Sequence, residues 1–127
     1  MAFVQVNPNP DELLTGDCVI RAISIATDKS WDETYLALMT YGFRLKDIPN
    51  ANWVWGVYLH NLGFRPYLIS DYVNGRYTVR DFVEDCPDCT GILATGTHVV
   101  AVKQGDYLDT WDSGDEVPLY YWKKEDE

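Results

Sequence analysis

Cys18 is the residue of this chain whose surroundings most favour chemistry. It follows Thr15-Gly16-Asp17, a turn-forming stretch, and begins an apolar segment that predicts a helix. The first N–H groups of a helix lack intrahelical partners and carry partial positive charge, which favours a thiolate over a thiol. A thiolate is a strong nucleophile near neutral pH. Free cysteines are also among the most buried residues, so Cys18 alone is equally consistent with a small core residue.

A histidine and a carboxylate occur far downstream in a segment, Gly96 to Asp112, that reads as two strands joined by a short turn. β-branched residues precede Gln104-Gly105-Asp106, which has turn composition, and strand-forming residues follow it. If Gln104 and Gly105 turn the chain, His98 faces Trp111. Asp109 is then the diagonal neighbour of His98 on the same face. A longer loop, or a turn centred one residue later, would remove this contact.

A histidine oriented by a carboxylate, together with a cysteine at a helix N-terminus, is the arrangement needed for nucleophilic acyl transfer. The imidazole accepts the thiol proton, the carboxylate fixes its tautomer, and the imidazolium later protonates the leaving group. Taken singly, His98 is also consistent with a structural sheet histidine and Asp109 with an edge-strand carboxylate. The order Cys, His, Asp along the chain favours the chemical interpretation.

These motifs resemble those of papain-like cysteine peptidases, most closely the compact bacterial and phage-type members similar to bacteriocin-processing leader peptidases. The matching positions are Asp17-Cys18, Ala22, Thr97 to Val102, and Asp109-Thr110-Trp111. They lie towards the two ends of the chain and leave residues 30 to 90 supported only by helical patterns.

The resemblance implies a cysteine hydrolase that cleaves a peptide or amide bond through a thioacyl-enzyme intermediate. It assigns Cys18 as nucleophile, His98 as general base and acid, and Asp109 as the orienting group. The same triad also serves transglutaminases and acyltransferases, which are alternatives. A catalytically inactive domain that binds a peptide or protein is a further alternative.

One position departs from the family pattern. Papain-like peptidases carry a glutamine about six positions before the nucleophile, and the residue here is Glu12, which cannot donate a hydrogen bond when ionised. We therefore expect the oxyanion hole to combine the backbone N–H of Cys18 with another donor, and Thr15 is the first choice. The remaining candidates are Gln5, Asn7 and Asn9.

The composition predicts a single domain over residues 1–127, since 46% of the 127 residues are hydrophobic and 14% are aromatic. A net charge of −10 opposes binding to nucleic acid and to anionic membranes. The sequence contains neither a membrane-spanning apolar run nor a secretory signal pattern, so we expect a cytoplasmic location. The expected partner is a peptide or protein substrate, and the expected state is a monomer.

Cys86 and Cys89 form a C-x-x-C pair, which suggests a redox dithiol or half of a zinc site. A redox pair of the thioredoxin type begins a helix, whereas Thr78 to Asp85 predicts a helix that precedes this pair. We therefore interpret the two as incidental cysteines in a helix-to-strand loop. The acidic residues from Asp109 to Glu116 lack EF-hand spacing, and we predict no metal and no cofactor.

Helical patterns followed by strands predict an α+β domain, and the resemblance implies that this domain has the papain-like fold. We expect a helix from Cys18 to Thr27 with Asp17 as its N-cap, and further helices from the Ser30 capping box, from Trp53 to Asn61, and from Thr78 to Asp85. A Gly63 C′ residue ends the third of these helices. The predicted inward stripe of the second helix consists of Tyr35, Leu38, Met39 and Phe43.

The predicted strands are Phe3 to Val6, Arg65 to Ile69, Ile92 to Thr95, the His98 hairpin, and Leu119 to Lys123. These would form a mainly antiparallel sheet against which the Cys18 helix packs. Arg21, one turn after Cys18, is expected to pair with Asp17 or with a carboxylate of the sheet. Trp53, Trp55 and Trp111 are candidates for a substrate groove, although tryptophans at such spacing are also common in cores.

Overall fold

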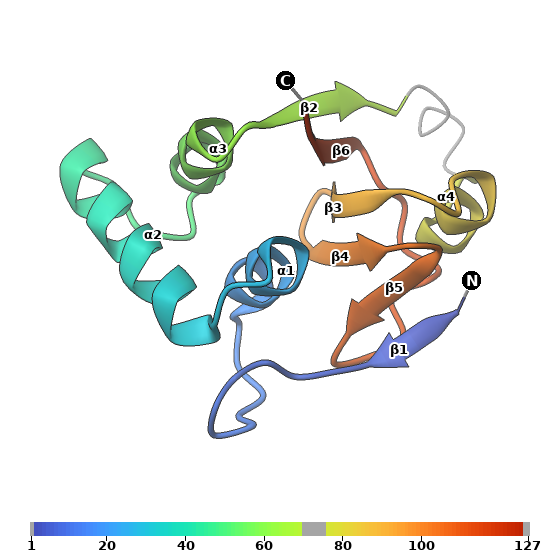
Figure 1. Cartoon of the computed structure of the whole chain (residues 1–127), viewed down its shortest axis with the longest axis horizontal. Coiled ribbons are helices and arrows are strands. Elements are labelled where there is room, and N and C mark those ends of the chain that lie inside the picture. The colour runs from blue at the N-terminus through green and yellow to red at the C-terminus, as the bar shows by residue number, and fades with distance from the viewer. Residues whose placement is uncertain (1, 70–75, 126–127) are drawn as a thin grey trace.

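A computed structural model describes residues 2–69 and 76–125, which form four helices and one six-stranded sheet (Figure 1). The elements are β1 (Phe3–Gln5), α1 (Cys18–Thr27), α2 (Trp31–Leu45), α3 (Asn52–Asn61), β2 (Phe64–Leu68), α4 (Val79–Asp85), β3 (Thr90–Ala94), β4 (Val99–Lys103), β5 (Asp106–Asp109) and β6 (Tyr120–Lys124).

The strand order in the sheet is β1-β5-β4-β3-β6-β2. Every pairing is antiparallel except that of β1 with β5, which is parallel. The predicted α+β class and mainly antiparallel sheet are therefore confirmed. Among the described residues, no helix combines the length and apolar character needed to cross a membrane.

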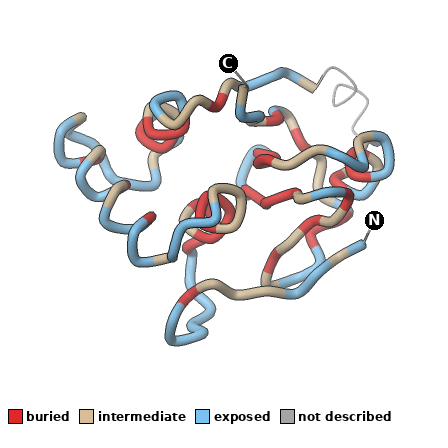
Figure 2. The backbone as a smooth tube through the Cα atoms, viewed as in Figure 1, coloured by how far each residue is buried: buried red, intermediate tan, exposed pale blue. Residues whose placement is uncertain are grey.

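Helices cover both faces of the sheet. α1, α2 and α3 share one core with alternate residues of the central strands, including Ile92, Ala94 and Ala101. The intervening residues, such as Leu93 and Val100, point to the other face and pack against α4. Figure 2 shows the buried positions gathered along α1 and the central strands. This alternation is the two-residue period of a sheet that is covered on both sides.

The β4–β5 hairpin has the predicted register, with Lys103 opposite Asp106 and Ala101 opposite Leu108. Gln104 and Gly105 both have positive φ, at 49° and 87°. Two consecutive residues with positive φ are typical of the tight turn whose twist suits a two-residue hairpin. This turn fixes the pairing of β4 with β5. His98 immediately precedes β4 and Asp109 ends β5, so the two residues lie at the same end of the ladder.

Helix α1 begins and ends as predicted, but Asp17 does not cap it as expected. Asp17 occupies the N-cap position without a hydrogen bond from its side chain to the helix. Its carboxylate instead pairs with Arg21 on the first turn of the helix and accepts the indole N–H of Trp31, 2.9 Å away. Asp17 therefore joins α1 to the start of α2.

The predicted buried stripe of α2 is wrong except for Leu38. Tyr35 and Met39 are exposed, and Phe43 is 75% exposed. The buried line of α2 consists of Thr34, Leu38 and Gly42, at a spacing of four residues. A Cβ atom at Gly42 would lie 2.8 Å from the carbonyl oxygen of Asp47. The helix thus packs along a narrow seam that includes small residues, which a search for large apolar side chains misses.

The other helices agree with the expectations. The predicted capping box at Ser30 is present, and Gly63 follows α3 with a φ of 95°. Thr78 forms a second capping box, which is not among the predictions made from the sequence. From the sequence we interpret Cys86 and Cys89 as incidental cysteines in a helix-to-strand loop, and the structure adds a bond between them. They lie in the predicted loop between α4 and β3 and form a disulfide.

Candidate active site

Cys18 is the first residue of α1 and the single free cysteine among the described residues. The start of α1 faces the segment from Thr95 to His98, which joins β3 to β4. Cys18, His98 and Val99 line the same cavity, and the His98 side chain and the backbone N–H of Val99 both act to lower the pKa of the thiol. The structure therefore brings the predicted nucleophile and the predicted base together.

Burial of the Cys18 thiol opposes its ionisation. The hydrogen bonds from His98 and Val99 act in the opposite direction, and so do the positive charges of His98 and Arg21, so the pKa of Cys18 lies below its ordinary value. Since a thiolate is the reactive form of cysteine, this environment raises the nucleophilicity of Cys18 near neutral pH.

His98 lies between the thiol and a carboxylate. Its Nε2 atom is 2.6 Å from Oδ2 of Asp109, which is the contact predicted from the hairpin register. Burial of the imidazole opposes protonation, but the hydrogen bonds to Asp109 and Cys18 and the negative charges of both raise the pKa of His98 to about 9. The pKa of the thiol is thus lowered and that of the imidazole raised, which are the directions that favour an imidazolium beside a thiolate.

Asp109 is held by several donors at once. Its Oδ2 atom also accepts the hydroxyl of Ser113 at 2.7 Å, and its Oδ1 atom accepts the backbone N–H of Thr110 at 2.8 Å. Burial raises the pKa of this carboxyl, but the hydrogen bonds from His98 and Ser113, the charge of His98 and the Thr110 N–H bring it below the ordinary value. Asp109 is therefore an ionised and oriented partner for His98.

Arg21 connects the helix to this carboxylate. Its guanidinium pairs with Asp17 and lies 3.3 Å from Oδ1 of Asp109. From the sequence, Asp17 or a carboxylate of the sheet is the expected partner of Arg21, and Arg21 pairs with both. All three side chains are buried, so the chain of charges runs inside the protein from the start of α1 to the end of β5.

The predicted second oxyanion donors do not gather at the thiol. Thr15 is exposed and does not line the cavity beside Cys18, and its carbonyl accepts a hydrogen bond from Arg21. The side-chain amides of Asn7 and Asn9 donate to Leu13 and to Asp17. Gln5, on the exposed edge strand β1, is also outside the cavity lining.

A cavity of about 540 Å³ opens beside Cys18 and His98. Trp55 lines it as predicted. Trp53 does not, because it lies 51% exposed with its indole N–H donated to Asp47. Trp111 lies outside the cavity lining, and its ring packs against the imidazole of His98 with centroids 4.8 Å apart.

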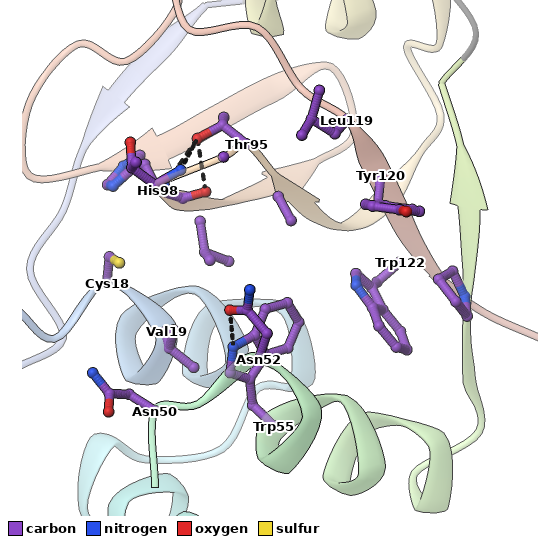
Figure 3. A pocket seen from close by; sticks show the side chains of 15 residues that line it. Cys18, Val19, Asn50, Asn52, Trp55, Thr95, His98, Leu119, Tyr120 and Trp122 are labelled. Atoms are coloured by element: carbon purple, nitrogen blue, oxygen red, sulfur yellow. Dashed lines mark hydrogen bonds between the residues drawn. The ribbon is translucent and has the colours of Figure 1, made fainter. Parts of the chain in front are cut away.

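The sequence reasoning missed the residues that supply the far wall and one polar edge of this cavity. Tyr120 and Trp122 enter it from β6, Asn52 enters from the first residue of α3, and Asn50 enters from the turn just before α3. The Oδ1 atom of Asn52 accepts the indole N–H of Trp55 at 3.2 Å. Figure 3 shows the Asn52 amide nitrogen turned away from that bond, towards the cavity.

No group of three or more His, Cys, Asp or Glu side chains within residues 2–69 and 76–125 could hold a metal ion. The acidic residues after β5 have other partners, since Arg80 pairs with Asp115 at 2.5 Å and with Asp112 at 3.5 Å. Cys86 and Cys89 are joined in a disulfide, so neither offers a thiolate as a ligand.

Comparison of the chain with protein-family models, with curated proteins and with solved structures finds no match.

Proposed function

We propose that this protein is a cysteine hydrolase that cleaves a peptide or amide bond, with Cys18, His98 and Asp109 as its triad. The observation that carries the proposal is the position of His98, which bonds Asp109 at 2.6 Å and lines the same cavity as the Cys18 thiol. Opposite shifts of the two pKa values, down for Cys18 and up for His98, support a thiolate and imidazolium pair.

In the proposed reaction the Cys18 thiolate attacks the carbonyl carbon of the bound amide and forms a tetrahedral oxyanion. The oxyanion collapses, the C–N bond breaks, and the His98 imidazolium gives its proton to the leaving amine. The neutral imidazole then takes a proton from water as the water oxygen attacks the thioester. The C–S bond breaks, the carboxylic acid leaves, and the thiolate and imidazolium are restored. Asp109 stabilises the imidazolium at each stage without accepting its proton.

The backbone N–H of Cys18 is one oxyanion donor in this proposal, because the first N–H groups of a helix have no intrahelical acceptor. A side-chain amide at the cavity edge, from Asn50 or Asn52, would supply the second. This replaces the Thr15 assignment.

The papain-like fold is part of the same proposal. Its support is a helix that carries a cysteine at its N-terminus and packs against β3, β4 and β5, with the histidine and the carboxylate supplied by the β4–β5 hairpin. A tryptophan two residues after Asp109 covers the imidazole.

A second candidate function is a catalytically inactive domain that binds a peptide. It is favoured by one specific observation, which is that none of Thr15, Asn7 and Asn9 offers a side-chain donor to the cavity. Loss of one oxyanion donor reduces turnover by roughly 10²–10³-fold in known enzymes. Thiol reactivity separates the two functions without knowledge of the substrate.

The test is the pH dependence of iodoacetamide alkylation, resolved by site with mass spectrometry and run without reductant so that the Cys86–Cys89 disulfide stays closed. We expect rapid labelling of Cys18 that persists below about pH 7. The His98→Ala variant should lose it. His60→Ala is the matched control, because His60 is the other histidine of the chain and lies exposed on α3. The hydrolase proposal would be overturned if labelling of Cys18 rose only near pH 8.5 and were the same in the parent protein and in His98→Ala.

A further inference from the structure

The cavity beside Cys18 has a reactive end and an aromatic end. In Figure 3, Cys18 and His98 lie at one end, and Tyr120 and Trp122 lie at the other. The rings of Trp55 and Trp122 meet edge to face, with centroids 5.7 Å apart and planes at 60°. Trp55 is almost completely buried, so its position is fixed by the core. This end of the cavity is therefore an aromatic surface that is anchored in the core through Trp55.

The wall carries no fixed charge. Of the described residues that line the cavity, none is Asp, Glu, Lys or Arg, although the chain as a whole has a net charge of −10. A charged group that entered the aromatic end would lose its hydration without gaining a partner of opposite charge, which is costly. An uncharged apolar group would lose unfavourable contact with water instead.

The cavity is large enough to hold a large side chain. Its volume of about 540 Å³ falls within the range of roughly 300–1,000 Å³ found for sites that bind small organic molecules. Aromatic side chains also gain from edge-to-face and offset contacts with other rings. Asn50 and Asn52 lie at the polar edge, where they can bond the backbone of a bound chain.

We propose that the aromatic end binds an uncharged aromatic or large aliphatic side chain of the substrate, next to the amide bond that Cys18 attacks. The position of the scissile bond rests on the proposed function. Binding of the side chain does not rest on the proposed function, because it needs no reaction of the thiol.

The first test uses the Cys18→Ala variant, which cannot react, titrated with N-acetyl-phenylalanine amide. The probe is followed through the indole N–H signals in NMR spectra. We expect the signals of Trp55 and Trp122 to shift and that of Trp53, which lies outside the cavity, to stay unchanged. The aspartate and lysine analogues of the probe should bind at least about tenfold more weakly, because their side chains gain nothing from burial.

The second test changes the wall. Tyr120→Asp places a carboxylate at the aromatic end and should weaken binding of the phenylalanine probe by about tenfold or more. Tyr67→Asp is the matched control, because Tyr67 is 44% exposed against 45% for Tyr120, lies on the adjacent strand β2, and does not line the cavity. Binding by this control should equal that of the parent protein.

Equal affinity for the charged and aromatic probes would overturn the inference, and so would unchanged binding by Tyr120→Asp. If either result is obtained with a protein whose Cys18 reacts rapidly, only the binding inference fails and the hydrolase proposal still stands. Selective shifts of Trp55 and Trp122 in a protein whose Cys18 reacts slowly would instead support the binding site and reject the hydrolase.

Discussion

Arg21 and Asp109 form a buried ion pair between helix α1, which begins with Cys18, and strand β5, with 3.3 Å between the guanidinium and Oδ1. The other oxygen of the same carboxylate bonds His98. Asp109 therefore serves two positive groups at once, and Arg21 also pairs with Asp17 on its own helix.

The first prediction concerns the removal of Arg21. Arg21→Met leaves Asp17 and Asp109 buried without their common cation and should destabilise the fold by about 3–5 kcal/mol, measured by urea unfolding. It should also raise the pKa of Cys18, because Arg21 is one of the charges that lower it. Arg21→Lys should recover part of both effects. Arg44→Met, on the exposed side of α2, is the control, and equal stability of the two methionine variants would contradict the prediction.

The second prediction concerns the ionisation of His98. Asp109→Asn removes a negative charge and a hydrogen-bonded carboxylate, so the pKa of His98 should fall from about 9 towards its ordinary value. The pH above which Cys18 is rapidly alkylated should move up, because an imidazole that protonates less readily stabilises the thiolate less. The measurement is an NMR titration of the imidazole C–H signals. Asp112→Asn is the control, because Asp112 bonds Tyr107 and leaves His98 untouched. A titration of His98 that is the same in both variants would reject the assignment.

The third prediction concerns stability as a function of pH. The folded-state pKa of His98, about 9, lies above the ordinary value of 6.5, so protonated His98 stabilises the fold fully below pH 6.5. This contribution should decline as the pH rises from 6.5 towards 9. Because the thiol titrates in the same range, the comparison is best made between Cys18→Ala and the double variant Cys18→Ala/His98→Gln. The gap between their urea midpoints should narrow with rising pH, and a constant gap would contradict the shift.

For Asp109, the contribution to stability depends on pH in the opposite direction. The folded-state pKa of Asp109 lies below its ordinary value of 3.8, so ionised Asp109 stabilises the fold above that pH. The contribution should be lost as the pH falls through the lowered pKa.

The fourth prediction concerns Gly91 on β3. A Cβ atom there would lie 2.2 Å from the backbone carbonyl oxygen of Trp122 on β6, and a backbone atom cannot move aside easily. Gly91→Ala should therefore cost about 2–3 kcal/mol of unfolding free energy, measured by thermal or urea unfolding. Gly96→Ala is the control, because a Cβ atom at Gly96 meets nothing within 4 Å. Similar stability of the two variants would show that β3 and β6 tolerate separation.

The hairpin and the His98–Asp109 contact could be predicted because the rules that set them are local. A two-residue turn at Gln104 and Gly105 fixes the register of the strands that it joins, and the register fixes which residues meet. The start of α1 at Cys18 is local in the same sense. Sequence reasoning therefore found three residues that the structure brings together.

The cavity wall could not be predicted because it depends on contacts between distant segments. Trp122 reaches the cavity only because β6 pairs with β3 on one side and with β2 on the other. The sequence offered Trp53 and Trp55 as a local pair, and the helix turns Trp53 out to solvent. Ser113 was missed for a related reason, since its bond to Asp109 is made by a loop outside the hairpin ladder.

Cys18 and Arg21 lie one turn apart on α1, and their partners His98 and Asp109 are themselves bonded across the end of the hairpin. A displacement of α1 along the sheet would therefore break the thiol contact and the buried ion pair together. Alkylation of Cys18 then reports on the docking of this helix as well as on chemistry. During unfolding in denaturant, the loss of fast labelling would mark the moment at which α1 leaves the sheet, even if other parts of the fold persist.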